Sequence, residues 1–185
     1  MARVPYLEPG DLAPEDRALL ARPIALFKAL VNSPNAARAF SALGGFIRNK
    51  SRLDPRLREL AILQVGWLAR APYEWSHHVK IGREFGVSDD DIRALIADTE
   101  GRPVTLDQPA LLVLRAAREM TSSGEASAEV MAALARHLSP ELLVDLVITI
   151  AFYNAVVRVL ATLQIEVEHE YEVYLREFPL PEPAA

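Results

Sequence analysis

Three polar side chains interrupt apolar helical faces, and they are of the types that transfer protons. On a helical wheel of residues 73–86, Glu74 and His78 fall inside the apolar arc, four residues apart on one face. The preceding segment, residues 57–69, is apolar almost all round, and Glu59 interrupts it. A carboxylate and an imidazole on a buried face are costly unless they form hydrogen bonds or take part in a reaction. Glu59, Glu74 and His78 are therefore the candidate catalytic residues for general acid–base chemistry.

A purely structural role for the three residues is the alternative. A glutamate and a histidine four residues apart can form a hydrogen bond that serves the fold alone. Glu59 can equally pair with a nearby arginine such as Arg52 or Arg56. The sequence alone leaves both interpretations open.

The remaining histidines predict no metal site. His77 falls at the edge of the wheel nearer the polar side, and we interpret it as a surface residue. His137 and His169 lie near predicted helix ends, where solvent is expected. The segment from Glu74 to His78 lacks the HExxH spacing of zinc sites, and no third ligand is evident. We expect neither a metal nor an organic cofactor.

The long apolar segment toward the C-terminus carries four polar residues at helical spacing. Tyr153 follows Thr149 by one turn, and Arg158 follows Asn154 by one turn. In one interpretation these residues satisfy one another's hydrogen bonds or bridge subunits. In the other, Tyr153 or Arg158 faces the candidate site and orients an anionic substrate.

Composition and charge exclude several classes of protein. The 185-residue chain has a formal net charge of −5, which argues against a nucleic-acid partner, because phosphate binding needs a basic face. The chain contains no cysteine, which excludes disulfides, zinc–thiolate sites and a thiol nucleophile. The charge-free stretch 146–157 is shorter than the roughly 20 residues that span a membrane. We therefore expect a cytoplasmic protein without a membrane partner.

The elements that must position these residues are all expected to be helices. No run alternates with a period of two residues, and Ser-Pro or Asp-Pro pairs mark several helix starts. We predict an all-α fold with an N-terminal arm (1–20), one compact helical domain (21–178) and a Pro-rich tail (179–185). A first helix is expected to begin at about residue 14 and to end or kink at Pro23. The other predicted helices lie at about residues 34–49, 55–70, 72–86, 89–98, 107–121, 127–137 and 140–165.

Three short motifs carry a resemblance to a known family. They are Leu57-Arg58-Glu59-Leu60-Ala61-Ile62-Leu63, Tyr73-Glu74-Trp75 with His78, and Gly86-Val87-Ser88 with Ile92. Together they resemble the core signature of the carboxymuconolactone decarboxylase family, whose all-helical fold is shared with alkylhydroperoxidase D. The resemblance extends over about residues 24–165 and is most specific from residue 59 to residue 92.

The resemblance bears on thiol chemistry. The peroxidase branch uses a glutamate, a CxxC pair and a histidine four residues after the second cysteine. Glu59 and His78 match the glutamate and the histidine, whereas Ala71 and Glu74 stand where the two cysteines are expected. Both sulfurs are missing, so thiol peroxidase activity is excluded despite the shared fold.

The decarboxylase branch implies a different reaction. It implies loss of CO2 from a small carboxylated lactone without a cofactor, with His78 as general acid and base and with Glu74 or Glu59 setting its tautomer and charge. Candidate groups for substrate binding are Trp75, Tyr153, Arg52, Arg58 and Arg158. Relatives of this type form homo-oligomers, often trimers or hexamers. Two alternatives remain: another proton-transfer or hydrolytic enzyme on the same scaffold, and a non-catalytic oligomeric protein.

Overall fold

Helices form every regular element of residues 1–181, the part of the chain that this computed structural model describes. The all-α fold class predicted from the sequence is therefore confirmed. Residues 182–185 of the predicted tail lie outside the described part. In chain order the elements are η1 (Pro9–Asp11), η2 (Pro14–Leu20), α1 (Ala25–Leu30), α2 (Pro34–Asn49), α3 (Pro55–Leu68), α4 (Pro72–Glu84), α5 (Asp89–Thr99), α6 (Gln108–Ser123), α7 (Ala128–Leu134), α8 (Pro140–Leu163), η3 (His169–Tyr171) and α9 (Glu172–Glu177).

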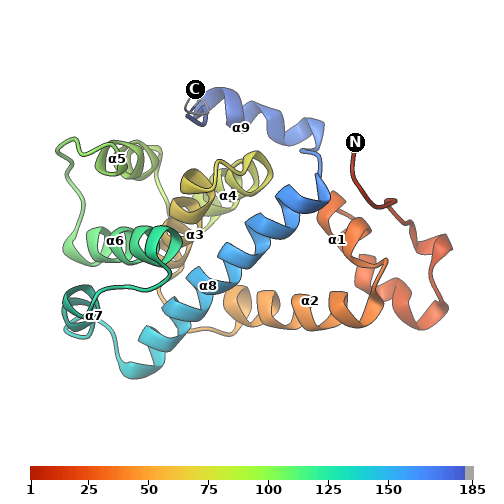
Figure 1. The fold of residues 1–185 in the computed structure, drawn as a ribbon, viewed down its shortest axis with the longest axis horizontal. Coiled ribbons are helices and arrows are strands. Elements are labelled where there is room, and N and C mark those ends of the chain that lie inside the picture. The colour runs from red at the N-terminus through yellow and green to blue at the C-terminus, as the bar shows by residue number, and fades with distance from the viewer. Residues whose placement is uncertain (182–185) are drawn as a thin grey trace.

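The central helix of the molecule is α3 (Figure 1). It packs against α4, α5, α6 and α8, as its apolar circumference predicts. Asp54 caps its first turn and accepts a hydrogen bond from the Leu57 N–H at 3.0 Å. Gly66 permits a close approach of α4, because a Cβ atom at this position would lie 3.5 Å from the backbone nitrogen of Trp75. The turn of α4 that carries Glu74 therefore lies directly against α3.

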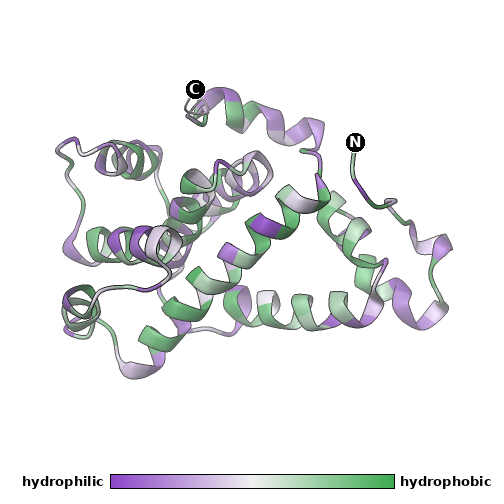
Figure 2. Cartoon of the chain, viewed as in Figure 1, coloured by the Kyte–Doolittle hydropathy of each residue, from purple (hydrophilic) through white to green (hydrophobic). Residues whose placement is uncertain are grey.

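The longest helix, α8, runs diagonally across the molecule in Figure 1 and packs against α2, α3, α4 and α6. Figure 2 shows that most of it is apolar, with few polar interruptions. By length and composition alone, α8 is long and apolar enough to cross a membrane. The core helix of a soluble protein meets the same two criteria. Its residues Leu146, Ile150 and Val157 are part of the hydrophobic core that also contains α3. In this compact helical domain α8 is a core helix.

The N-terminal arm covers one end of the domain. It contains two 3-10 helices, and Pro23 lies between η2 and α1. The arm begins beside the end of α8, where the Arg3 N–H donates a hydrogen bond to the Leu163 carbonyl at 2.8 Å. A second hydrophobic cluster joins the arm to α1 and α2 through Leu12, Leu20, Val31 and Ala37.

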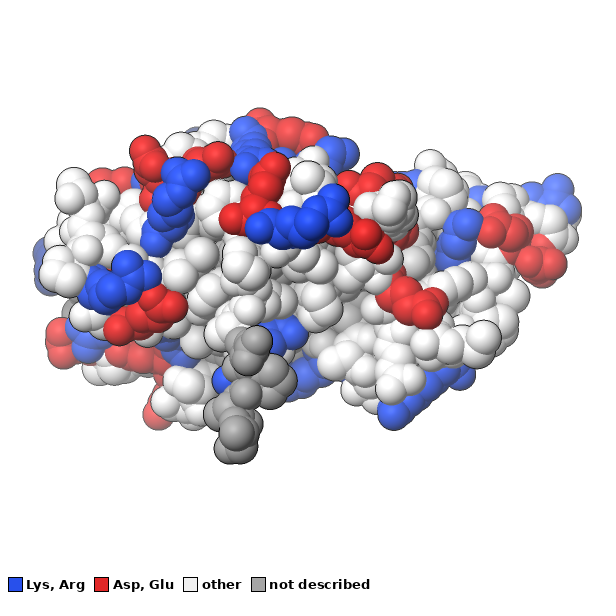
Figure 3. All heavy atoms as spheres, turned by 90° about the horizontal axis from the view of Figure 1, so that it is seen from above, with Lys and Arg blue, Asp and Glu red and all other residues white. Residues whose placement is uncertain are grey.

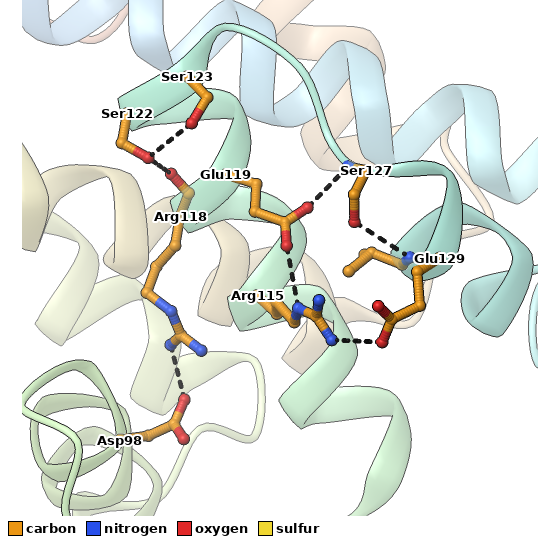
Figure 4. A network of polar contacts seen from close by, with 9 residues as sticks. Asp98, Arg115, Arg118, Glu119, Ser122, Ser123, Ser127 and Glu129 are labelled. Carbon is orange, nitrogen blue, oxygen red and sulfur yellow. Dashed lines mark hydrogen bonds and ion pairs between the residues drawn. The ribbon is translucent and has the colours of Figure 1, made fainter.

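Polar contacts fasten α7 and α5 to α6 (Figure 4). Arg115 donates to Glu119 at 2.9 Å, and Glu119 accepts the backbone N–H of Ser127, the N-cap of α7, at 2.7 Å. Arg118 donates to Asp98 of α5 at 2.6 Å. These contacts hold together the side of the molecule opposite the N-terminal arm (Figure 1).

Acidic and basic side chains are interspersed on the face that Figure 3 shows. No extended basic area is present on this face. This view agrees with the acidic composition and offers no surface there for a polyanion.

The predicted helix starts agree closely with the structure. Helices α2, α3 and α8 begin at the predicted prolines, Pro34, Pro55 and Pro140. Gly44 does not break α2; it faces the ring of Phe152, which would lie 3.6 Å from an added Cβ atom. Several details differ from the prediction. The helix expected from about residue 14 is the 3-10 helix η2, which ends at Leu20, and α7 ends at Leu134, before the predicted residue 137. Neither α1 nor α9 was predicted.

Candidate active site

His78 of α4 and Glu59 of α3 meet in the interior. Nδ1 of His78 lies 2.7 Å from Oε2 of Glu59, and both side chains are buried. A carboxylate in this position holds a proton on Nδ1 and fixes the orientation of the ring. Glu59 is therefore the residue that orients His78, and Nε2 of the imidazole remains for other contacts.

Arg58 holds the Glu59 carboxylate in place. Its Nε donates to Oε1 of Glu59 at 2.9 Å, and its Nη1 donates to the backbone carbonyl of Arg48 at 3.2 Å. Arg58 and Glu59 are only 2% and 1% exposed, so this ion pair is wholly internal. The sequence suggested Arg52 or Arg56 as the partner, but Arg56 pairs with Asp91.

Glu74 faces the other nitrogen of His78. Its Oε1 lies 3.0 Å from Nε2, within ion-pair range. The contact is not aligned as a hydrogen bond, so within residues 1–181 this buried oxygen has no hydrogen-bond partner. A buried acceptor of this kind needs a donor, which water or a ligand can supply.

The electrostatics of the cluster favour a charged imidazolium. Burial alone would lower the pKa of His78, but the carboxylates of Glu74 and Glu59 raise it to about 9. Burial would likewise raise the pKa of Glu59, but His78 and Arg58 hold it below its usual value. At neutral pH two carboxylates therefore face two cations, and His78 carries a proton that it can donate.

A cavity of about 480 Å³ opens beside this cluster, and Glu74 and His78 form part of its wall. Residues of α1, α2, α4 and α8, together with the segment before α1, enclose it. Its walls are mostly apolar and include Leu26, Phe40 and Phe152. The volume lies within the range of about 300–1,000 Å³ that is typical of small-molecule sites.

Tyr153 and Arg48 add polar groups to the same wall. The Tyr153 ring meets His78 edge-on, with ring centroids 5.0 Å apart. Burial raises the pKa of the Tyr153 hydroxyl, as do the charges of Glu74 and Glu59, and the nearby Arg48 guanidinium opposes this rise. Tyr153 is therefore a neutral donor at pH 7. No feature of the sequence had singled out Arg48, which lies in the last turn of α2.

His77 is buried, which corrects the surface position predicted from the helical wheel. Its ring is stacked between Tyr73 and Tyr171, with centroid distances of 4.1 and 3.6 Å, and its Nε2 lies 2.8 Å from Glu168. Burial lowers the pKa of His77 in spite of Glu168, so the neutral ring donates its Nε2 proton to the carboxylate. Glu168 also accepts the Ala25 N–H at 2.7 Å. The wheel missed this arrangement because the covering residues are remote in sequence.

Four of the five predicted substrate-binding residues lie outside the cavity wall, and one of them, Arg58, pairs with Glu59. Trp75 is completely buried in the core, where its Nε1 donates to the Phe178 carbonyl at 2.7 Å. Arg52 is exposed and is not part of the cavity wall. Arg158 is also exposed and donates to Asn154 Oδ1 at 2.9 Å, so these two polar residues of α8 satisfy each other. Of the predicted set, Tyr153 alone contributes to the wall.

The donor groups do not form a metal centre. Within residues 1–181, no group of three or more His, Asp or Glu side chains is arranged to hold a metal ion. We therefore describe the site by its acid, base and hydrogen-bonding groups.

Solved structures define the class of fold. The chain resembles an uncharacterized peroxidase-related protein with an alkylhydroperoxidase AhpD core from Ralstonia eutropha JMP134, with a TM-score of 0.75 and 20% identity over 94% of this chain and 95% of that chain. A peroxidase-related protein from Silicibacter sp. TM1040 gives a TM-score of 0.73 and 19% identity over 91% of each chain. The debrominase Bmp8 gives a TM-score of 0.70 and 19% identity over 83% of this chain and 81% of that chain. The protein has the alkylhydroperoxidase D-like all-α fold.

A family model matches the segment that carries the site. Residues 34–101 match the model of the carboxymuconolactone decarboxylase family, and this segment contains Arg48, Glu59, Glu74 and His78. The family resemblance read from the motifs is thus confirmed, in a chain without cysteine. No curated protein sequence matches the chain.

Proposed function

We propose that the protein is a cofactor-independent lyase or isomerase that acts on a small carboxylated lactone or a related acid. The observation that supports this proposal is the position of His78. It lies in the wall of a cavity of ligand size and is charged by two carboxylates from two helices. A histidine placed in this way is a proton donor beside a space that a substrate can fill.

The proposed reaction needs only groups that the chain contains. When the C–C bond to the departing carboxylate breaks, CO2 leaves and its electron pair delocalises into the lactone carbonyl. His78 then donates its Nε2 proton to the ring carbon, and it regains a proton from water before the next turnover. The ring of Tyr153 meets that of His78 edge-on, and in this proposal its neutral hydroxyl stabilises the enolate oxygen.

The two glutamates have different roles in this proposal. Glu59 is fixed by Arg58 and by His78 Nδ1, so it orients the ring and does not itself reach the cavity wall. Glu74 is in the wall, and among residues 1–181 its one polar side-chain contact is the misaligned contact to Nε2. It is therefore the carboxylate that meets the substrate and passes protons between solvent and His78.

Another proton-transfer or hydrolytic reaction is the second candidate. The similar fold occurs in proteins described as peroxidase-related and as a debrominase, so the scaffold itself does not fix a reaction. This chain has no thiol with which to perform peroxidase chemistry. A cavity with a charged histidine and a weakly held carboxylate also suits hydrolysis of a small ester.

A non-catalytic role is the third candidate. The observation that favours it is the internal pairing of Arg58, Glu59 and His78, whose charges offset one another in the core. A structural cluster of this kind predicts a wild type without turnover and loss of folding when one member is changed.

The deciding experiment measures turnover directly. Purified protein without added metal or thiol is mixed with 4-carboxymuconolactone, and the ultraviolet spectrum and CO2 release are followed. We expect turnover in the wild type and in His169→Gln, because His169 is exposed at the surface. His78→Gln should lose at least about 100-fold in rate, which is the usual contribution of a general acid.

Two outcomes contradict the proposal. Equal turnover in His78→Gln removes this residue from the mechanism. Absence of turnover in the wild type at high enzyme concentration removes this substrate and leaves the other two candidates.

A further inference from the structure

Among residues 1–181, a cation without a carboxylate partner lies in the cavity wall beside the candidate catalytic cluster. Glu59 and Glu74 face Arg58 and the imidazolium of His78, so these four buried groups together carry no net charge. Arg48 lies outside this balance. Its side chain forms no ion pair with any carboxylate of residues 1–181.

The position of Arg48 is fixed by its neighbours. Its backbone carbonyl accepts a hydrogen bond from Arg58 at 3.2 Å, which ties the end of α2 to the candidate catalytic cluster. Its half-buried side chain lies in the cavity wall and is near enough to the Tyr153 hydroxyl to affect its pKa. Because Tyr153 contacts His78, an anion on Arg48 lies next to the proton donor.

The rest of the wall favours an apolar ligand body. Leu26, Phe27, Phe40, Phe152 and Val156 line the space, and burial of apolar ligand surface against such side chains contributes roughly 25 cal/mol per Å². A guanidinium surrounded by apolar walls attracts an anion more strongly than one in bulk water, because the local dielectric constant is lower. The cavity therefore combines a cationic group beside the candidate catalytic cluster with a hydrophobic chamber.

We propose that the cavity binds a compact, largely apolar carboxylic acid, and that Arg48 pairs with one carboxylate of this ligand. In the proposed decarboxylation that carboxylate is the spectator group that anchors the substrate, and a second carboxylate, on the carbon that faces His78 and Glu74, leaves as CO2. The inference rests on the proposed function for the fate of the ligand, whereas binding itself requires only the cavity and Arg48.

Arg22 is the competing cation. It also lies in the cavity wall, but it comes from the segment before α1 and, among residues 1–181, forms no hydrogen bond or ion pair with the candidate catalytic cluster. The position of Arg48 between α2, Tyr153 and Arg58 favours it as the anchor.

Calorimetric titration with two simple ring compounds tests this assignment. Benzoate and benzamide have nearly the same shape and differ in charge, so the wild type should bind benzoate more tightly. Arg48→Gln should lower the affinity for benzoate at least about tenfold, the usual effect of removing a charge-assisted hydrogen bond. The same substitution should leave the affinity for benzamide unchanged. Arg52→Gln is the matched control, since Arg52 is exposed and outside the wall, and it should bind benzoate as the wild type does.

Two further variants make the result unambiguous. Arg48→Lys keeps the positive charge and should recover part of the affinity that Arg48→Gln loses. His78→Gln should still bind benzoate, so failure of the proposed catalysis and failure of this binding site are measured separately. Thermal unfolding of each variant verifies that it is folded.

Several outcomes overturn the assignment. Equal affinity of the wild type for benzoate and benzamide, or no binding of benzoate at all, removes the anion site. A loss in Arg52→Gln as large as that in Arg48→Gln shows a general effect of surface charge. A loss in Arg22→Gln with none in Arg48→Gln transfers the site to the other arginine.

Discussion

At the residue scale, each ring nitrogen of His78 lies next to a carboxylate, and the two carboxylates are held in place to different degrees. Glu59 is bound by Arg58 and aligned with Nδ1, whereas Glu74 approaches Nε2 without an aligned hydrogen bond. Glu59 fixes the orientation of the ring, and Glu74 faces the cavity. This asymmetry is what a proton donor requires, because the proton must leave toward the substrate and not toward the core.

The pKa of His78 should depend on both carboxylates. Its value of about 9 is raised by Glu74 and Glu59 against the effect of burial. Changing Glu59→Gln should lower the pKa by at least about one unit, because a neutral amide no longer stabilises the imidazolium. Proton NMR titration of the histidine resonances measures this change, with His78→Gln identifying the signal. The exposed Glu170→Gln is the control, and an unchanged pKa in Glu59→Gln would contradict the coupling.

The stability of the fold should fall at alkaline pH for the same reason. The folded-state pKa of His78 lies above its ordinary value of 6.5, so its stabilising contribution is complete below about pH 6.5 and is lost as the pH rises through about 9. The difference in free energy of unfolding between wild type and His78→Gln should therefore shrink from about pH 7 to about pH 10. Urea unfolding at several pH values measures it. A constant difference over this range would show that His78 is neutral in the folded protein.

Periodicity within one helix identified part of this site and missed the rest. Glu74 and His78 share a face of α4, so the wheel alone placed them together, and the apolar surroundings of Glu59 marked it as buried. The burial of His77 depends on Glu168, which lies 91 residues further along in an irregular segment. The role of Arg48 depends on which helices enclose the cavity. Such contacts between distant segments leave no periodic pattern in the sequence.

At the element scale, the helix starts explain why the fold was largely predictable. Proline in the first turn and a polar N-cap residue act within a few positions of the helix start, so both signals can be recognised in the sequence without knowledge of tertiary contacts. The close packing of α3 against α4 was harder to predict from the sequence, because it depends on the absence of a side chain at Gly66. The short helix α9 carries no such start signal and was missed.

Two serine N-caps should differ in their contribution to stability. Ser88 accepts a hydrogen bond from the Asp91 N–H at 3.1 Å in a reciprocal capping box, whereas the Ser33 side chain makes no capping hydrogen bond. Ser88→Ala should therefore lower the free energy of unfolding by about 1 kcal/mol, and Ser33→Ala by less than half as much. Chemical denaturation of the two variants measures the difference. Equal losses would mean that the capping hydrogen bond of Ser88 contributes nothing.

At the scale of the whole molecule, the apolar surface of α8 extends beyond the core. Val144 is 56% exposed and Leu43 of α2 is 37% exposed, so both helices present apolar side chains to the surroundings. We retain the proposal that the protein is a homo-oligomer in the cytoplasm. Association would bury these side chains and add stability to the helices that enclose the cavity.

The assembly state is measurable in solution. The chain has a mass of 20.5 kDa, and we expect light scattering after size-exclusion chromatography to give the mass of a trimer or a hexamer. Val144→Glu should shift the distribution toward the monomer, because it places a charge on the exposed apolar face of α8. A monomeric wild type over a wide concentration range would remove the proposal.

The hydrogen bond between Ala25 and Glu168 joins residues that are 143 positions apart. During synthesis the N-terminal segment leaves the ribosome before its partner, which is made 143 residues later. Helices α3 and α4 can pair earlier, so the histidine cluster is able to assemble while one wall of the chamber is still open. The apolar residues of the arm can pack on α1 and α2 before then, whereas the tether through Glu168 forms last. The wall of the cavity is complete only after α8 has followed α1, α2 and α4 out of the ribosome.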